Sequence, residues 1–231
     1  YQRMGYLPEA LVNYLGRMGW SMPDEREKFS LEEMLAEFDI QRVSLGGPIF
    51  DLEKLNWLNG LWLRESLSDS ELADRLIEWG FNRENLMRVI PHLKTRIETL
   101  SDFAPGAGFL LSGMLSLDVA EFDALKLEKE SQLGVLQFSL WRLEEQTDWH
   151  RDSLMATLKQ LADAMDIKLK DFLAPLFVAI AGSTQSFSVM DAMSLLGSDL
   201  SRARLRHAIA VQGGVSKKQL KKLEKVYRGL C

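Results

Sequence analysis

Helix-start signals and apolar residues at helical spacing recur along the whole chain, and they limit its fold more than any other feature. Ser30 stands three residues before Glu33, and Ser68 stands three residues before Glu71. At this spacing each side chain accepts a hydrogen bond from the other residue's backbone N–H at a helix start. Pro8 fits the first turn of a further helix. Because no segment alternates convincingly between apolar and polar residues, we predict an all-α fold with short connections.

Glycine and proline mark where these helices are expected to begin and end. The pair Asn59-Gly60 and the single Gly80 predict helix ends, and Pro91 predicts a helix start. The run 104–108 contains one proline and two glycines and predicts a break between domains. Later helices are expected at 119–127, 131–144, 150–165, 168–181, 188–196 and 201–210, with a last one capped by Ser216.

Three apolar stripes predict helix faces that are buried against neighbours. Their members are Leu11, Leu15 and Met18 in the first stripe, Leu31, Met34, Leu35 and Phe38 in the second, and Leu93, Ile97 and Leu100 in the third.

Composition is that of a soluble globular protein, with 46% hydrophobic and 26% charged residues. The apolar runs are too short to span a bilayer, and we expect no membrane partner. The single cysteine, Cys231, excludes an internal disulfide and fits a reducing cytoplasm. The three histidines lie far apart without ligand spacing, so no metal site is expected. The first residue is Tyr1, which favours a piece of a longer protein.

The net charge of −5 is unevenly distributed along the chain. Residues 118–152 carry an excess of acids, whereas nine bases and one acid follow Leu200. Such a basic block is usually a solvated helix face, and it can also attract nucleic-acid phosphates. We find no phosphate-binding loop, dinucleotide fingerprint or serine-nucleophile motif. The residues alone therefore predict a helical binding module without catalytic residues.

Residues 1–60 resemble the glutamyl-tRNA synthetases, which are class I aminoacyl-tRNA synthetases. The strings that carry this resemblance are GYLPEALVNYL at 5–15, GWSMPD at 19–24, FSLEEM at 29–34, RVS at 42–44 and FDLEKLNWLNG at 50–60. Weaker matches continue with RIETL at 96–100, TDW at 147–149, APLFVAIAG at 174–182 and LLG at 195–197.

The resemblance implies the C-terminal half of a bacterial-type enzyme. Residues 1–60 would be the end of the stem-contact domain, and 61–115 and 116–231 would be two helical anticodon-binding domains. The full-length enzyme uses ATP and magnesium to ligate glutamate to tRNA(Glu), and those sites would lie upstream of this chain. We therefore expect no cofactor and no ligase activity in the chain alone, and a cytoplasmic monomer that binds tRNA(Glu) but not DNA.

The resemblance also assigns candidate tRNA contacts. Arg96 would read the third anticodon base, which is C in glutamate tRNA and G in glutamine tRNA, whereas an ordinary surface arginine would pair with Glu98 or Asp102. Phe177 stands where the family has arginine, and Phe187 where it often has proline, so these positions depart from the pattern. The expected anticodon-binding residues are Arg96, Phe177, Ser186, Phe187 and Val189, and the expected backbone-binding residues are Lys217, Lys218, Lys221 and Lys222.

Two alternatives come from other classes. A helical protein-interaction module without RNA binding would explain the acidic middle segment. A helix-turn-helix DNA-binding protein is permitted by the turn at Gly213-Gly214, but no base-reading set of side chains is evident on the flanking helices.

Overall fold

The structure is a computed structural model that describes residues 1–230, and Cys231 lies outside the described residues. It divides into two compact units, residues 1–83 and 84–231. No strand occurs in residues 1–230, which confirms the all-α prediction. None of the described helices is long and apolar enough to cross a membrane. The domain boundaries expected at 60 and 115 stay a prediction.

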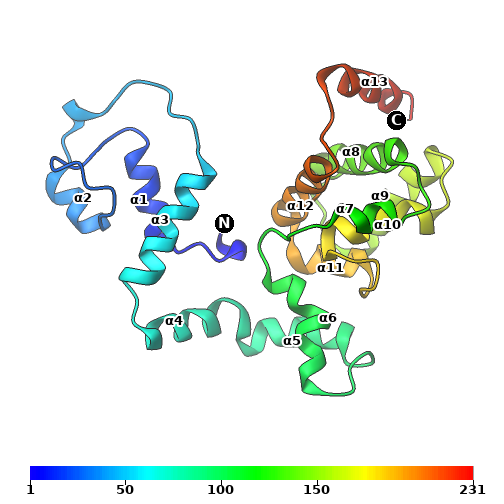
Figure 1. The fold of residues 1–231 in the computed structure, drawn as a ribbon, viewed down its shortest axis with the longest axis horizontal. Coiled ribbons are helices and arrows are strands. Elements are labelled where there is room, and N and C mark those ends of the chain that lie inside the picture. The colour runs from blue at the N-terminus through cyan, green and yellow to red at the C-terminus, as the bar shows by residue number, and fades with distance from the viewer. Residues whose placement is uncertain (231) are drawn as a thin grey trace. The chain divides into compact units, whose positions relative to one another are not determined.

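The first unit is built on two helices that pack against each other, α1 and α3 (Figure 1). Its elements are η1 (Gln2–Met4), α1 (Pro8–Arg17), α2 (Leu31–Glu37), η2 (Ile40–Arg42), α3 (Leu52–Glu65), α4 (Asp69–Leu76) and the π-helical turn η3 (Ile77–Phe81). Both predicted capping boxes are confirmed, at the starts of α2 and α4. Tyr14 of α1 packs with Leu55 and Leu58 of α3 to form one apolar cluster. Trp20, Met22 and Phe29 form a second cluster in the loop that follows α1.

Asn13 holds these two clusters together. Its side chain is 1% exposed, and its amide nitrogen donates to the Glu27 carbonyl oxygen at 3.1 Å. The amide oxygen accepts from the Phe29 backbone N–H at 3.3 Å and from Trp62 Nε1 at 3.0 Å. One buried amide therefore joins α1, the loop and α3.

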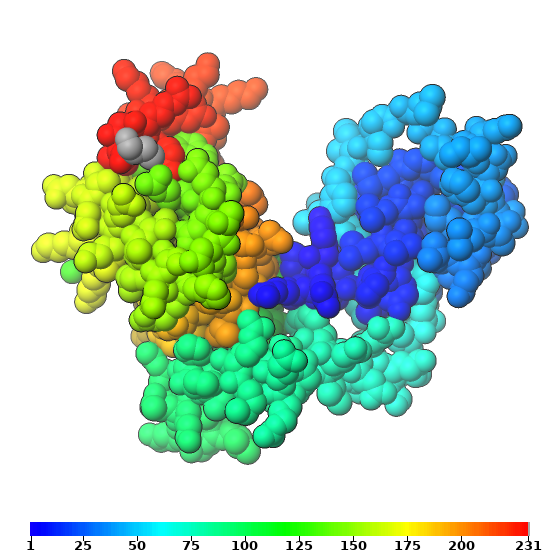
Figure 2. Space-filling view, turned by 180° about the vertical axis from the view of Figure 1, so that it is seen from behind, coloured from blue at the N-terminus to red at the C-terminus, as the bar shows by residue number. Residues whose placement is uncertain are grey.

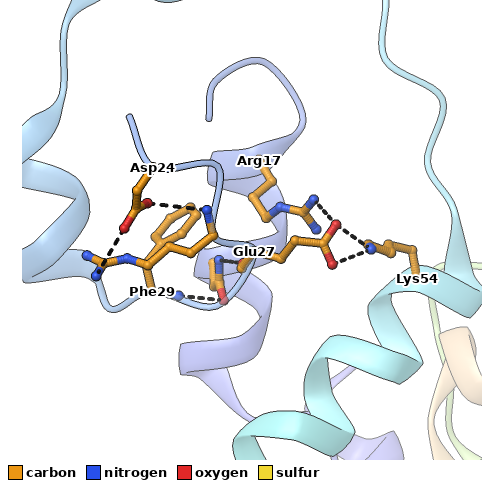
Figure 3. Close-up of polar contacts among 7 residues, drawn as sticks. Arg17, Asp24, Glu27, Phe29 and Lys54 are labelled. Atoms are coloured by element: carbon orange, nitrogen blue, oxygen red, sulfur yellow. Dashed lines mark hydrogen bonds and ion pairs between the residues drawn. The ribbon is translucent and has the colours of Figure 1, made fainter. Parts of the chain in front are cut away.

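An ion-pair cluster reinforces the same three segments at the surface. Figure 3 shows the Glu27 carboxylate between Arg17 and Lys54, with nitrogen–oxygen distances of 2.6 Å to each. The hydrogen bond from Lys54 and the nearby positive charge of Arg17 hold the pKa of Glu27 below its usual value. Because the three side chains are partly exposed, each pair stabilises the unit modestly.

The second unit is a helical bundle in which α8, α10 and α12 pack against one another. The elements that lead into it are α5 (Arg83–Leu93), η4 (Leu100–Asp102), α6 (Phe103–Ala107) and η5 (Gly108–Leu111). The bundle comprises α7 (Val119–Asp123), α8 (Lys129–Glu145), α9 (Arg151–Ala164), α10 (Leu169–Ala181), α11 (Val189–Leu196), α12 (Ser198–Val211) and α13 (Lys217–Arg228). Ser216 caps α13 as predicted.

Three predicted interruptions are wrong. Gly60 lies within α3, which continues to Glu65 because Leu61 and Trp62 also pack on the first apolar cluster. Pro91 lies in the last turns of α5 and does not begin a helix. Residues 104–108 are helical and form no local break, although a domain joint there stays a prediction. Gly106 lets α6 approach Leu93 closely, since a Cβ there would lie 2.5 Å from Leu93 Cδ1.

The predicted burial of the three apolar stripes is confirmed only in part. In the first stripe, Leu11 and Met18 pack on the core, but Leu15 is 56% exposed. In the third, Leu93 is buried, whereas Leu100 is 91% exposed because α5 ends at Leu93. The second stripe is largely exposed on α2, and its most exposed member, Leu35, is 67% accessible.

We predict that Asn13→Ala lowers the free energy of unfolding of the first unit by about 1–3 kcal/mol. The substitution would remove the hydrogen-bond partner of three polar groups in the interior, on Glu27, Phe29 and Trp62. Thermal or denaturant unfolding, followed by tryptophan fluorescence, measures the change. The matched control is Gln41→Ala, which removes an exposed amide and should leave stability unchanged. Equal stabilities of the two variants would contradict the role given to Asn13.

Candidate nucleic-acid interface

Arg96 lies at the surface of the second unit, in the turn that follows α5. Its side chain is exposed, and its Nη1 donates to the Ser186 carbonyl oxygen at 3.2 Å. Within the described residues it makes no ion pair with Glu98 or Asp102, the alternative that an ordinary surface arginine would favour. The Asp102 carboxylate instead accepts from the backbone N–H groups of Thr99 and Glu98 at 2.8 and 2.9 Å, and these bonds lower its pKa.

The hydrogen bond of Arg96 brings two candidate segments together across 90 residues of sequence. Ser186 belongs to the loop that connects α10 and α11, and Gly182 begins this loop in the left-handed conformation with φ 79°. Thr184 and Gln185 are exposed at its tip. An arginine and an exposed polar loop thus form one surface within the second unit.

Two contacts of His92 attach the end of α5 to this loop and to α11, and their partners are held by further contacts. The rings of His92 and Phe187 stack with centroids 5.5 Å apart. Phe187 also packs on Phe109 at 5.5 Å. His92 Nδ1 lies 3.8 Å from a carboxylate oxygen of Asp191, and Arg151 Nε lies 3.2 Å from the other oxygen. The turn that carries Arg96 is therefore attached to the loop and α11 through His92, which directly precedes it, and through Arg96 itself.

The remaining candidate residues of this region differ in exposure. Phe177 is half-buried on α10. Phe187 and Val189 are 3% and 1% exposed and belong to the core. The Ser186 hydroxyl is buried without a hydrogen-bond partner. In this conformation Arg96 and the loop tip face solvent, and base contacts by the other residues stay a prediction.

The four candidate lysines lie on α13, and all are exposed. Figure 2 shows this helix in red at the edge of the second unit, over α8. Tyr227 attaches it there by packing on Phe138 and Trp141, with ring centroids 5.5 and 5.2 Å apart. Lys222 pairs with Glu130 at 2.9 Å, and this hydrogen bond raises the pKa of Lys222.

The arginines of α12, which belong to the same basic block in sequence, lie against the protein. Arg202 donates to the carbonyl oxygens at the end of α8, including Leu143 at 2.9 Å, and lies 5.2 Å from the ring of Trp149. Arg206 pairs with Glu144. Arg204 is completely buried. Within the basic block Arg204 is therefore buried and Arg202 is half-buried, whereas Arg206 and the bases of α13 are exposed.

Sequence reasoning missed His92, Asp191 and Arg204. The pair of His92 and Asp191 has no local signal, since 99 positions separate the two residues. Arg204 did have a local signal in the sequence, because it stands four residues after Leu200 and four before Ala208, within the apolar stripe of α12. An arginine at such a position predicts a buried guanidinium that needs partners.

Comparison with known proteins now identifies the family. The profile described as "Anticodon binding domain" matches residues 71–209. The chain belongs to this family. Residues 1–57 also match the profile "tRNA synthetases class I (E and Q), catalytic domain". Within the described residues, no group of three metal-ligating side chains comes together.

Similar proteins confirm the predicted resemblance to the C-terminal half of glutamyl-tRNA synthetases. The glutamate–tRNA ligases of Saccharophagus degradans and Alcanivorax borkumensis are 65% and 60% identical over 230 residues, which is all of this chain and 46% of each relative. The chain thus spans about half the length of these relatives. A crystal structure of a glutamate–tRNA ligase from Elizabethkingia meningosepticum shares the fold, with a TM-score of 0.51 at 24% identity, covering 89% of this chain and 41% of that one.

We predict that Phe187→Ala lowers the free energy of unfolding of the second unit by about 3–5 kcal/mol, because the buried ring packs between His92 and Phe109. Phe177→Ala is the control, since its half-buried ring should cost less. Denaturant unfolding of the two variants measures both effects. A larger destabilisation by Phe177→Ala would show that Phe187 is not the core residue of this region.

Proposed function

We propose that this chain is the tRNA-binding part of a glutamate–tRNA ligase and recognises the anticodon of tRNA(Glu). The observation that carries the proposal is the exposed Arg96 beside the loop 182–188, inside the residues that match the anticodon-binding family. Single-stranded anticodon bases can be splayed out and hydrogen-bonded on their edges, which requires donors that are exposed and held in place. Arg96 meets both conditions.

A guanidinium suits base recognition because its donors are fixed in one plane. Arginine has five N–H donors, and the bond to Ser186 uses one of them. Others can donate to base acceptors such as the carbonyl oxygen of cytosine. The third anticodon base is C in glutamate tRNA and G in glutamine tRNA, so this contact would distinguish the two.

In the whole enzyme the role of this part is positional. The enzyme activates glutamate with ATP and magnesium and transfers it to tRNA(Glu), and this chain carries no ATP-binding motif. We therefore expect a cytoplasmic monomer that binds tRNA(Glu) without ligating glutamate. Residues 1–60 would end the stem-contact domain, and 61–115 and 116–231 would bind the anticodon.

The surface of residues 1–57 supports their assignment to a larger domain. Twelve of the 21 exposed large hydrophobic side chains of the described residues lie in this quarter of the chain, among them Leu35, Ile40, Leu45 and Ile49. These residues match the catalytic-domain profile. Exposed apolar clusters commonly mark a contact surface, and the remainder of the catalytic domain would supply the cover.

We predict that Arg96→Gln narrows the preference for tRNA(Glu) over tRNA(Gln). One good base contact is worth about 1–3 kcal/mol, and the variant would no longer make it. Binding of both transcripts to the wild-type protein and the variant, in one buffer at one salt concentration, measures the ratio of affinities. Duplex DNA of equal length tests for general nucleic-acid binding.

Lys94→Gln is the matched control, because it removes an exposed positive charge from the same turn. This variant should weaken the binding of both tRNAs alike and leave the ratio of their affinities unchanged. If Arg96→Gln also leaves the ratio unchanged while both affinities survive, Arg96 does not read the base. Failure of the wild-type protein to bind either tRNA would refute the proposed function as a whole.

The exposed lysines of α13 generate a separate prediction about phosphate attraction. Changing Lys217, Lys218 and Lys221 to Gln should weaken tRNA binding broadly and reduce the slope of log affinity against log salt by about 0.7 for each lysine–phosphate ion pair that the change removes. Lys222→Gln alone should change this slope less, because Glu130 already neutralises the charge of Lys222. Titrations at several salt concentrations give the slopes.

The control replaces three exposed lysines of α9 and the start of α10, namely Lys159, Lys168 and Lys170, with Gln. This variant has the same net charge but keeps the basic face of α13. Equal slopes for the two triple variants would mean that only net charge matters and that α13 is a solvated face.

A further inference from the structure

Arg204 is the largest fully buried side chain of the protein's described residues, and it lies in the middle of α12. Burial lowers the pKa of its guanidinium to about 10, so the group remains charged at neutral pH. All the acceptors that the structure gives it are backbone carbonyl oxygens. Nε donates to Gly113 at 3.0 Å and Nη2 to Phe109 at 2.7 Å, and further bonds reach Ser112 and Ile180.

These acceptors belong to two separate stretches of the chain. Phe109, Ser112 and Gly113 lie in and just after η5, whereas Ile180 lies in the last turn of α10. About one turn further along α12, the His207 ring contacts the Leu115 carbonyl oxygen through Nε2 at 3.0 Å. One face of α12 therefore binds both the connector 109–115 and the end of α10.

Each stretch leads directly to one part of the candidate anticodon surface. The connector continues from the segment that carries Arg96, and its Phe109 ring packs on Phe187. Ile180 precedes Gly182, where the loop that carries Ser186 begins. The Arg204 guanidinium thus bonds to the backbone next to both segments that Arg96 joins at the surface, namely its own segment and the loop 182–188.

We propose that Arg204 is a positioning residue for anticodon discrimination: it fixes the segment carrying Arg96 relative to the loop 182–188. It contacts no base itself. The inference rests on the proposed function, since the segments it positions are the proposed readers. Its consequence is that a buried residue of α12 controls which anticodon is preferred.

The chemistry of the side chain explains why arginine is needed. The planar guanidinium carries donors that point in several fixed directions, so it can bond to carbonyls from two segments at once. A lysine ammonium in the same place keeps the charge but concentrates its donors on one atom. Arg204→Lys should therefore keep the bundle folded while the two segments lose their fixed spacing.

The test compares Arg204→Lys and Arg204→Met with Arg202→Met, the matched control. Arg202 lies on the same helix and also bonds to backbone carbonyls, but these are at the end of α8, away from the proposed readers. Two measurements are made on each protein. The first is the ratio of affinities for tRNA(Glu) transcripts with C or G as the third anticodon base. The second is hydrogen exchange of amides 109–115 and 182–188 in the free protein.

We expect both Arg204 variants to reduce the protection of these amides and to reduce the ratio by about tenfold, which corresponds to roughly 1.4 kcal/mol. Arg202→Met should leave both readouts unchanged, even where it lowers the melting temperature. If Arg204→Lys reduced the protection of these amides but left the ratio of affinities unchanged, the positioning role would be overturned and the proposed function would stand. If Arg202→Met reduced the ratio of affinities equally, the effect would come from general destabilisation, and the positioning role of Arg204 would be overturned. A wild-type protein without preference between the transcripts would refute the proposed reading by Arg96, and the inference with it.

Discussion

The buried guanidinium of Arg204 is the interaction on which the arrangement of the second unit depends. A charged group without solvent is expensive unless hydrogen bonds satisfy it, and here four carbonyl oxygens do so. These carbonyls lie at helix ends and turns, where backbone oxygens often lack a helical partner, although the Phe109 oxygen also accepts from the Ser112 N–H at 3.4 Å. Asn13 has the same relation to the first unit, where its three directional hydrogen bonds fix the loop after α1. In each unit a buried polar side chain therefore joins irregular segments to the helices beside them.

The sequence predicted the fold well where local signals decide the structure. The two predicted capping boxes and the predicted cap at Ser216 begin helices as expected, because their hydrogen bonds involve only neighbouring residues. The helices predicted after residue 116 are found, although most differ by a few residues at their ends. Predictions failed at Gly60 and Gly106, where packing on the Tyr14 cluster or against Leu93 outweighs the local preference for a break. The prediction at Pro91 also failed, because this residue lies near the end of α5 and not at a helix start.

The candidate surface shows the other limit of sequence reasoning. Arg96 and the loop at Ser186 were each selected, but their hydrogen bond joins residues 90 positions apart and has no local signal. Burial of Phe187 was equally hidden, because its neighbours His92 and Phe109 come from a different segment. Residue type identified the candidates, whereas only the packing of the bundle shows which of them face solvent.

The distribution of charge is compatible with the polyanionic partner of the proposed function, although the protein is acidic overall. The segment after Leu200 carries a net charge of +8, from nine bases and one acid, and the preceding residues carry −13, which together give the total of −5. Three of those bases are the α12 arginines that bond to the protein, of which only Arg206 is exposed, and the other six are exposed on α13. Under the proposed function, the acidic remainder would repel phosphate, so RNA would be attracted more to α13 and would be oriented as well as bound.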